Sequence, residues 1–238
     1  MSIIEQRQVA NQLLAALPPA DFARLAPALV AVDLAVYQTL FRAEEEVEAA
    51  YFVETGTISM LAHLEDGHLV EIGMVGSDGM AGLPFVFGTA ISPADAVVQI
   101  PGRSLRVAAP AFRRVLQESP ALTSMLLRYA QAFHTQVSLA AGCNATHNIV
   151  HRLARWLLME HDRAGSDEFP LTHEIMSQML AVRRTGVTVT AGALRSAGLI
   201  DYSRGKIIIL DRPGLEKAAC ECYGTIQRIT KRLNAPRP

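Results

Sequence analysis

Residues 171–210 read LTHEIMSQMLAVRRTGVTVTAGALRSAGLIDYSRGKIIIL, and this stretch decides the fold of the C-terminal part of the chain. Thr172 can cap the start of a helix, and apolar residues then recur at helical spacing as far as Leu180. After a short break, a second helix is predicted over residues 183–197. The remaining residues predict a small β-hairpin that turns at residues 203–206. Two short helices and a hairpin in this order indicate a winged helix-turn-helix, which is a DNA-binding unit.

The second helix opens with side chains that can donate hydrogen bonds to phosphates and to base edges in a major groove. Further contacts to the DNA backbone are expected from the start of the first helix and from the hairpin, or wing. Arg183 and Arg204 could alternatively be no more than solvated cations. The predicted DNA-binding residues are Thr172, Arg183, Arg184, Thr185, Gly186, Thr188, Ser203 and Arg204.

The composition of the second helix is unfavourable for an isolated helix. It is rich in β-branched residues and contains Gly186 and Gly192, each of which costs about 1 kcal/mol relative to Ala. We therefore expect this helix to be held by tertiary packing. The side chains predicted to pack are Val187, Val189, Ala193 and Leu194.

The first 118 residues have a different texture. Between residues 29 and 108, short β-favouring runs such as residues 36–37 and 57–61 alternate with turn signals at residues 54–56 and 76–79. This spacing is typical of an antiparallel sandwich or jelly roll. With short helices on either side, residues 1–118 are predicted to form a sensor-like β-domain, and the whole chain is of the α+β class.

A long helix is predicted over residues 119–143, because Ser119 can cap it and Pro120 suits its first position. Its seam residues recur in alternating steps of four and three, the heptad pattern of a two-helix interface. We expect a homodimer stalk, although packing on the chain's own β-domain would give the same pattern. Gly142 and Asn144 mark an expected hinge, followed by a DNA-binding domain over residues 144–238. The predicted dimer residues are Leu122, Leu126, Tyr129, Phe133, Gln136, Ala140 and Cys143.

Composition sets limits on location and partner. The sequence has no apolar run of membrane-spanning length and no secretory signal, and its odd number of cysteines fits a reducing compartment. We therefore expect a cytoplasmic protein that does not bind membranes. Lys and Arg outnumber Asp and Glu by 14 to 9 from His151 onward, whereas before it they number 8 against 14. A basic C-terminal part is consistent with DNA contact by that part alone.

The order of β-domain, heptad helix and winged helix resembles the Crp/Fnr family of bacterial transcription regulators over nearly the whole chain. Residues 51–58 (YFVETGTI) are similar to that family's strand-turn-strand signature, and residues 171–200 to its helix-turn-helix signature. The resemblance implies a homodimer on a pseudo-palindromic operator in double-stranded DNA, with Arg184 as chief base reader. It also implies contact with RNA polymerase if the protein is an activator. Two departures are Ala181, where Gly is usual, and Thr185, where Glu is frequent.

The resemblance raises the question of a cyclic nucleotide, which the family often binds with a Glu and an Arg. Gly82 stands where that Glu is expected, and no Lys or Arg lies between His68 and Arg103. A buried phosphodiester without a cation would be weakly held. We therefore expect no control by a cyclic nucleotide and leave the effector unassigned. The apolar residues of this loop predict either β-domain core or a pocket for an uncharged effector.

Metal and redox sites are weakly indicated, and none is predicted. Iron–sulfur members of the family have cysteines near the N-terminus, whereas the first cysteine here is Cys143. Cys143, His147 and His151 share one helical face, but three successive turns span too great a length for one ion. Cys220 and Cys222 lie in a predicted helical tail, residues 213–233. They could be ordinary thiols or a redox pair.

The sequence leaves one other class of function open beside a DNA-binding regulator. The alternative is a small-molecule or redox sensor module whose helix-turn-helix mediates protein contacts. No nucleophile–base pair, paired carboxylates or closed metal set is recognisable in the sequence, so we do not expect an enzyme.

Overall fold

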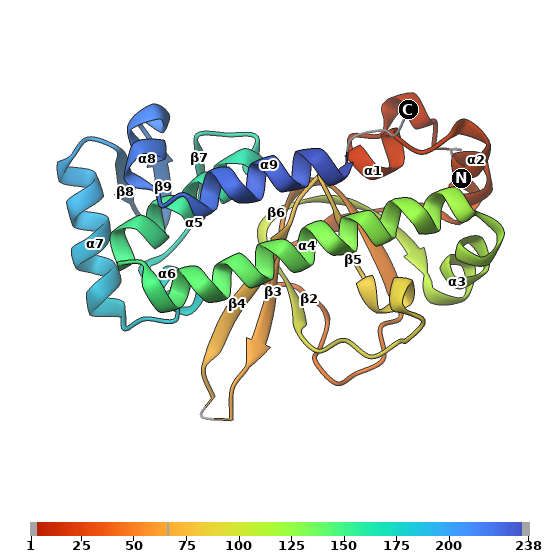
Figure 1. The fold of residues 1–238 in the computed structure, drawn as a ribbon, viewed down its shortest axis with the longest axis horizontal. Coiled ribbons are helices and arrows are strands. Elements are labelled where there is room, and N and C mark those ends of the chain that lie inside the picture. The colour runs from red at the N-terminus through yellow and green to blue at the C-terminus, as the bar shows by residue number, and fades with distance from the viewer. Residues whose placement is uncertain (1–3, 66, 235–238) are drawn as a thin grey trace.

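The computed structural model describes residues 4–65 and 67–234. An N-terminal β-domain and a C-terminal helical domain lie at opposite ends, and one long helix, α4, runs along both (Figure 1). The fold is therefore of the α+β class that the sequence predicts.

The β-domain is one antiparallel sheet in the order β1-β6-β3-β4, with β2 paired to β6 and β5 paired to β3. Residue 56 lies inside β3 rather than at its end. Gly56 has a φ of +83°, and a Cβ there would meet the carbonyl oxygen of Ile100 at 2.4 Å. The strands are β1 (Val30–Leu34), β2 (Thr39–Phe41), β3 (Ala49–His63), β4 (Leu69–Val75), β5 (Met80–Ala81) and β6 (Asp95–Ala108).

Two local predictions for this domain were wrong. Residues 54–56 form no turn, because the register shift around Gly56 is a bulge within a continuous strand that pairs with β6. Residues 36–37 form no strand, because Tyr37 takes a left-handed conformation (φ 64°) in the turn between β1 and β2. The turn at residues 76–79 is present between β4 and β5.

Short helices close the ends of the sheet. Phe112 of α3 is fully buried and packs edge-on against Phe52 of β3 and Phe85. These aromatic contacts anchor α3 to the sheet just before α4 begins. The elements are η1 (Gln6–Gln8), α1 (Gln12–Ala15), α2 (Pro19–Leu25), η2 (Ala26–Ala28), η3 (Leu83–Phe87) and α3 (Ala109–Glu118).

Helix α4 (Pro120–Thr146) starts as predicted, with the Ser119 hydroxyl accepting a hydrogen bond from the amide of Leu122 at 3.1 Å. It continues past Gly142 and Asn144, so the break lies at residues 147–148, a little later than the predicted hinge. A Gly within a helix lowers its stability but does not end it, and the flanking helical hydrogen bonds are sufficient here.

The heptad face of α4 packs within the chain. Tyr129 donates a hydrogen bond to the carbonyl of Met80 at 3.0 Å, and Gln136 donates one to the carbonyl of Met74 at 3.1 Å. These contacts match the alternative interpretation of the heptad repeat, in which the helix packs on the chain's own β-domain. They do not support the predicted dimer seam at these side chains. Phe133 is half-buried, and the other six are buried: Leu122, Leu126, Tyr129, Gln136, Ala140 and Cys143.

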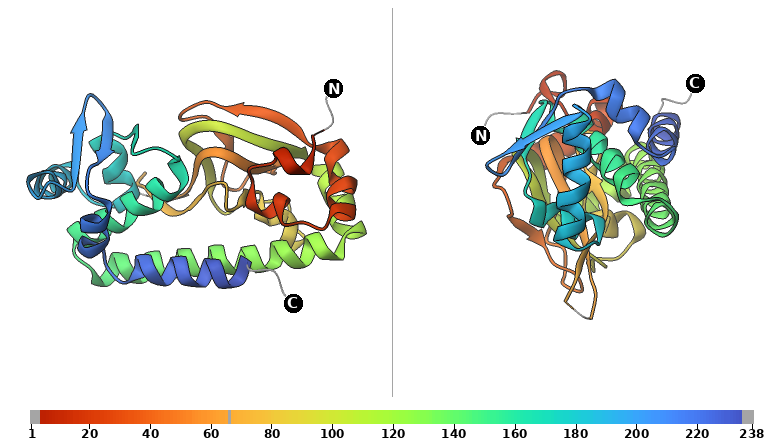
Figure 2. Two further views of the ribbon diagram at one scale, coloured as in Figure 1. Left: turned by 90° about the horizontal axis from the view of Figure 1, so that it is seen from above. Right: turned by 90° about the vertical axis from the view of Figure 1, so that its left-hand side faces the viewer.

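The C-terminal domain begins with α5 (Ile149–Ala164) and contains the predicted helices α6 (His173–Leu180) and α7 (Arg184–Ser196). A small sheet in the order β7-β9-β8 completes it. The predicted helical tail is in fact two helices, α8 and α9, and α9 runs back alongside α4 (Figure 2). The remaining bounds are β7 (Glu168–Pro170), β8 (Ile200–Ser203), β9 (Lys206–Ile209), α8 (Arg212–Ala218) and α9 (Cys222–Asn234).

The two domains share a hydrophobic core. Leu61, Met74 and Ile100 of the sheet belong to the same buried cluster as Trp156 and Leu157 of α5. Trp156 thus helps to anchor the C-terminal core and also joins it to the sheet. Among the described helices, none combines the length and apolar character required to cross a bilayer.

Candidate functional site

The helix-turn-helix is held by caps and by a tight turn. The Thr172 hydroxyl accepts a hydrogen bond from the amide of Ile175 at 3.2 Å and so caps α6. Ala181, where Gly is usual in the family, adopts a left-handed conformation with φ 50° and ψ 50°. An L-residue tolerates this region at some cost in conformational energy, which the surrounding packing must offset.

Helix α7 presents one face to the protein and one to solvent. Val187 and Leu194 are buried as predicted, whereas Val189 is 74% exposed and Ala193 is also exposed. The packing prediction for these last two residues was wrong, because they lie on the outward side of the helix. Thr190 and Ala191, which were not predicted to pack, are buried instead.

The predicted DNA-binding residues lie around the start of α6, at the start of α7 and at the tip of the wing. Thr172 is brought to the wing because the amide of Leu171 donates to the carbonyl of Gly205 at 2.8 Å. The wing turn is tight, with Arg204 (φ 51°) and Gly205 (φ 78°) both left-handed. Thr172 and Gly186 are half-buried, and the exposed members are Arg183, Arg184, Thr185, Thr188, Ser203 and Arg204.

His173 organises this surface and was not singled out from the sequence as a structural residue. Its Nδ1 lies 3.1 Å from the Thr188 hydroxyl, and its ring lies edge-on to Tyr202 of the wing at 4.9 Å. Burial and the nearby Arg184 lower the pKa of His173 below its ordinary value. The imidazole is therefore neutral at pH 7, which suits a packing role better than a phosphate contact.

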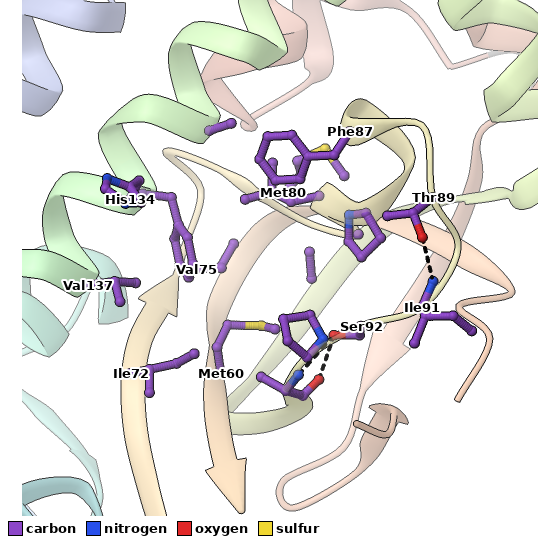
Figure 3. Close-up of a pocket in the computed structure, with 18 residues that line it drawn as sticks. Met60, Ile72, Val75, Met80, Phe87, Thr89, Ile91, Ser92, His134 and Val137 are labelled. Atoms are coloured by element: carbon purple, nitrogen blue, oxygen red, sulfur yellow. Dashed lines mark hydrogen bonds between the residues drawn. The ribbon is translucent and has the colours of Figure 1, made fainter. Parts of the chain in front are cut away.

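A second feature is a cavity of about 390 Å³ between the sheet, the loop around η3 and α4 (Figure 3). None of its lining side chains carries a permanent charge, and His134 is the one titratable group among them. Figure 3 shows Phe87 above the cavity, His134 and Val137 of α4 at its left, and Met60 and Ile72 of the sheet below. The lining residues are Met60, Ile72, Val75, Met80, Ala81, Gly82, Leu83, Pro84, Phe87, Thr89, Ile91, Ser92, Pro93, Ala94, Ala130, Phe133, His134 and Val137.

The residues that line the cavity include neither a carboxylate nor a Lys or Arg side chain. Gly82, at the position where a Glu was expected, has a φ of +117°, and a Cβ there would lie 3.1 Å from the Cα of Ala50, so a side chain at this position would be strained and tightly packed. Arg163 of α5 approaches the preceding loop, but its guanidinium is bound to Asp78 at 2.6 Å. The cavity can therefore enclose apolar groups but offers no cation to a phosphate.

The contact between α5 and the sheet contains buried carboxyl groups. Glu71 accepts hydrogen bonds from Trp156 Nε1 at 2.7 Å and from the Ser59 hydroxyl at 2.6 Å. Glu160 accepts one from the Thr57 hydroxyl at 3.0 Å. Burial raises the pKa of Glu71 to about 7, and burial together with the nearby Glu71 raises the pKa of Glu160 to about 8.

A cluster of metal-ligand side chains forms where α4 meets α9. Cys143 and His147 meet the turn between α8 and α9, whereas His151, on the same helical face in the sequence, is exposed and lies outside the cluster. A hydrogen bond with Cys220, aided by His147 and Arg155, lowers the pKa of Cys143 to about 4. The members of this cluster, hereafter the thiol–imidazole cluster, are Cys143, His147, Cys220 and Cys222.

Comparison with known proteins identifies both domains. Residues 32–119 match the cyclic nucleotide-binding domain family, and residues 151–218 match the Crp-like helix-turn-helix domain family. No curated protein matches the chain at a significant level.

Solved structures share the fold across most of the chain. A putative Crp/Fnr-family transcriptional regulator from Eubacterium rectale is 18% identical, with 91% of this chain and 97% of that chain covered and a TM-score of 0.67. FixK2 from Bradyrhizobium japonicum is 14% identical, with 81% and 98% covered and a TM-score of 0.65. A CRP/FNR-family regulator from Thermus thermophilus is 23% identical, with 80% and 98% covered and a TM-score of 0.63.

Proposed function

Because its two matched domains and its fold place the chain in the Crp/Fnr family of transcription regulators, we propose that it is a homodimeric, sequence-specific DNA-binding regulator. The observation that carries this proposal is the exposed surface formed by the start of α7 and the wing. Arg184 is the chief base reader, and Arg204 is a contact to the DNA backbone. The binding site is a pseudo-palindrome in double-stranded DNA.

The placement of the two arginines supports these roles. Arg184 is the first residue of α7 and is exposed, so its guanidinium is free to enter a major groove and bind a guanine edge. Arg204 lies at the tip of the wing, where a cation can approach a phosphate. By contrast, Arg195 near the end of α7 is held by Asp201 at 2.8 Å and by the ring of Tyr202. Its charge is therefore already paired.

Homodimerisation is proposed through the outward face of α4. Exposed positions on this helix recur in the same steps of three and four as the buried ones, and Leu127 is 48% exposed. Such a face could pair with its symmetry mate while the inward face holds the β-domain. The exposed positions in this repeat are Ser124, Leu127, Gln131, His134, Ser138, Ala141 and Ala145.

Control by a cyclic nucleotide is not proposed. The apolar lining of the cavity and the absence of a charged side chain among its lining residues favour an uncharged, largely hydrophobic effector. The proposal that the helix-turn-helix instead mediates protein contacts has less support, because the exposed residues at its tip include three arginines, Arg183, Arg184 and Arg204.

The decisive experiment is selection of bound DNA from a random library at moderate salt, with and without cyclic nucleotide. We expect a palindrome to be enriched in both arms to the same degree. Enrichment only with the nucleotide would contradict the effector proposal alone, whereas failure to retain any DNA would contradict DNA binding itself. Sedimentation of the wild type and of Leu127→Glu tests the dimer, and we expect the variant to sediment as a monomer.

Two variants separate base reading from backbone contact. Arg184→Ala should cost about 1–3 kcal/mol of binding free energy and relax specificity at one operator position. Arg204→Ala should weaken binding evenly across sequences and flatten the salt dependence. Arg195→Ala is the matched control and should change operator affinity little. A uniform loss from Arg184→Ala would overturn its assignment as the base reader.

A further inference from the structure

The thiol–imidazole cluster has the dimensions of a single-ion site. The ligand atoms all lie within 4.8 Å of one another. The Cys143 and Cys220 sulfurs are 3.5 Å apart, and the Cys222 sulfur lies 3.7 Å from Nδ1 of His147. In a tetrahedral zinc site with Zn–S bonds of about 2.3 Å, ligand atoms are separated by about 3.8 Å. The side chains therefore need to move by less than about 1 Å to enclose one ion.

The imidazole is oriented as a ligand by a carboxylate behind it. Nε2 of His147 lies 3.2 Å from the Glu221 carboxylate, which places the ring proton on Nε2. The lone pair of Nδ1 then faces the thiols. A histidine that binds a metal almost always donates its other ring N–H in this way. Packing of small apolar thiols alone would explain neither the imidazole nor its orientation.

The surroundings can accommodate the charge of a loaded site. Three thiolates and one divalent ion carry one net negative charge. Arg152 and Arg155 of α5 are buried beside Cys143 and interact electrostatically with it. The Nε atoms of both guanidinium groups have no hydrogen-bond partner among the described residues. Cationic groups at this position stabilise an anionic metal centre.

We propose that the thiol–imidazole cluster is a closed tetrahedral site for one divalent ion of zinc type. Binding displaces to solvent the protons that the thiols still carry and requires no change in oxidation state. A two-iron cluster fits less well, because its thiolates bind different irons and stand farther apart than 4.8 Å allows.

The proposed ion joins segments that are distant in the sequence. Cys143 and His147 lie at the end of α4, and the other two ligands lie at the turn between α8 and α9. The bound ion would fix the break between α4 and α5 and hold α9 against α4. Its role is therefore to set the position of the DNA-binding domain, as a structural zinc would.

The first test measures metal in the untagged full-length protein, purified under reducing conditions. We expect about one zinc per protomer in the wild type and a loss of at least about fivefold in Cys220→Ser. His151→Ala is the matched control, because His151 is an exposed histidine one turn beyond His147, and its zinc content should equal that of the wild type. Equal losses in His151→Ala and Cys220→Ser would overturn the proposed ligand set.

A second test avoids variants that fail to fold. Zinc is removed from the wild type with a chelator, and Zn²⁺ or Co²⁺ is added back. We expect Zn²⁺ to raise the Tm by about 5–15 °C, and Co²⁺ to give a thiolate-to-cobalt absorption band. Glu221→Gln should weaken zinc affinity by about 10-fold without changing the band. An unchanged Tm, iron with acid-labile sulfide in the purified protein, or a disulfide between Cys143 and Cys220 under these conditions would each overturn the proposal.

Discussion

The same β-domain contributes to the cavity beside α4 and to the contact between α5 and the sheet. Apolar side chains line the first, whereas the second contains ionisable side chains. The cavity has apolar walls and no permanent charge. The α5 contact contains Glu71, Glu160 and the pair of Asp78 with Arg163 within an apolar surround. An apolar cavity can exchange its contents without affecting ionisation. The stability of a contact with buried carboxyl groups, by contrast, depends on the charge state of those groups.

The largest expected effect concerns the ion pair of Asp78 with Arg163 at the contact between α5 and the sheet. The Arg163 side chain is 9% exposed and that of Asp78 is 23% exposed, so Arg163→Met leaves a carboxylate that is largely shielded from water. We expect the free energy of unfolding, measured with urea, to fall by about 2–4 kcal/mol. Arg7→Met removes the exposed pair with Glu5 and should cost less than about 0.5 kcal/mol. Equal losses of unfolding free energy in the two variants would show that the contact between α5 and the sheet does not depend on this pair.

An intermediate effect is expected from pH. The pKa of Glu160 is about 8 in the folded chain, raised by burial from about 4.5, so stability is greatest where the carboxyl is protonated in both states. It is then lost as pH rises through about 8. Glu71, with a pKa of about 7, contributes in the same direction. From pH 5.5 to 8.5 we expect a loss of a few kcal/mol.

The control for this pH dependence is a pair of matched substitutions. Glu160→Gln should flatten the slope of unfolding free energy against pH, since the amide keeps the shape of the side chain and cannot ionise. Glu174→Gln changes an exposed carboxylate of α6 and should leave the slope unchanged. A slope that survives in Glu160→Gln and Glu71→Gln together would contradict the assignment.

The smallest effect on stability is expected at the cavity. Ala130 lines it from α4, and Ala130→Leu should fill part of its volume of about 390 Å³ with a change in unfolding free energy below about 1 kcal/mol. Binding of the uncharged fluorescent probe N-phenyl-1-naphthylamine should weaken by at least about 10-fold. Ala141→Leu, at an exposed position of the same helix, should not alter probe binding. Competition by a cyclic nucleotide would contradict the proposed character of the cavity.

Local signals in the sequence were sufficient to predict the helix-turn-helix with its wing and the start of α4. Thr172 and Ser119 each cap a helix through their own side chains, and the wing turn is set by residues within the turn. Local signals could not decide what lies opposite a residue. The positive φ of Gly56 serves a turn or a bulge equally well, and only its contact with the carbonyl of Ile100 on β6 distinguishes them.

Contacts between distant parts of the chain explain the remaining differences. A heptad repeat has the same spacing whether its partner is another chain or the same chain's sheet, so the burial of Leu126 against the β-domain was not decided by the sequence. The thiol–imidazole cluster joins residues 77 positions apart. Its sequence signal was divided between the end of α4 and a tail whose helical break at residues 219–221 was not predicted.

The core shared by the two domains limits how this protein can be divided or recombined. Leu61, Met74 and Ile100 are supplied by the sheet, so a fragment containing only the DNA-binding domain would expose the apolar surface of Trp156 and its neighbours. A chimera that exchanges the β-domain for another sensor would have to restore these side chains. The DNA-binding domain of this chain is therefore not an interchangeable module.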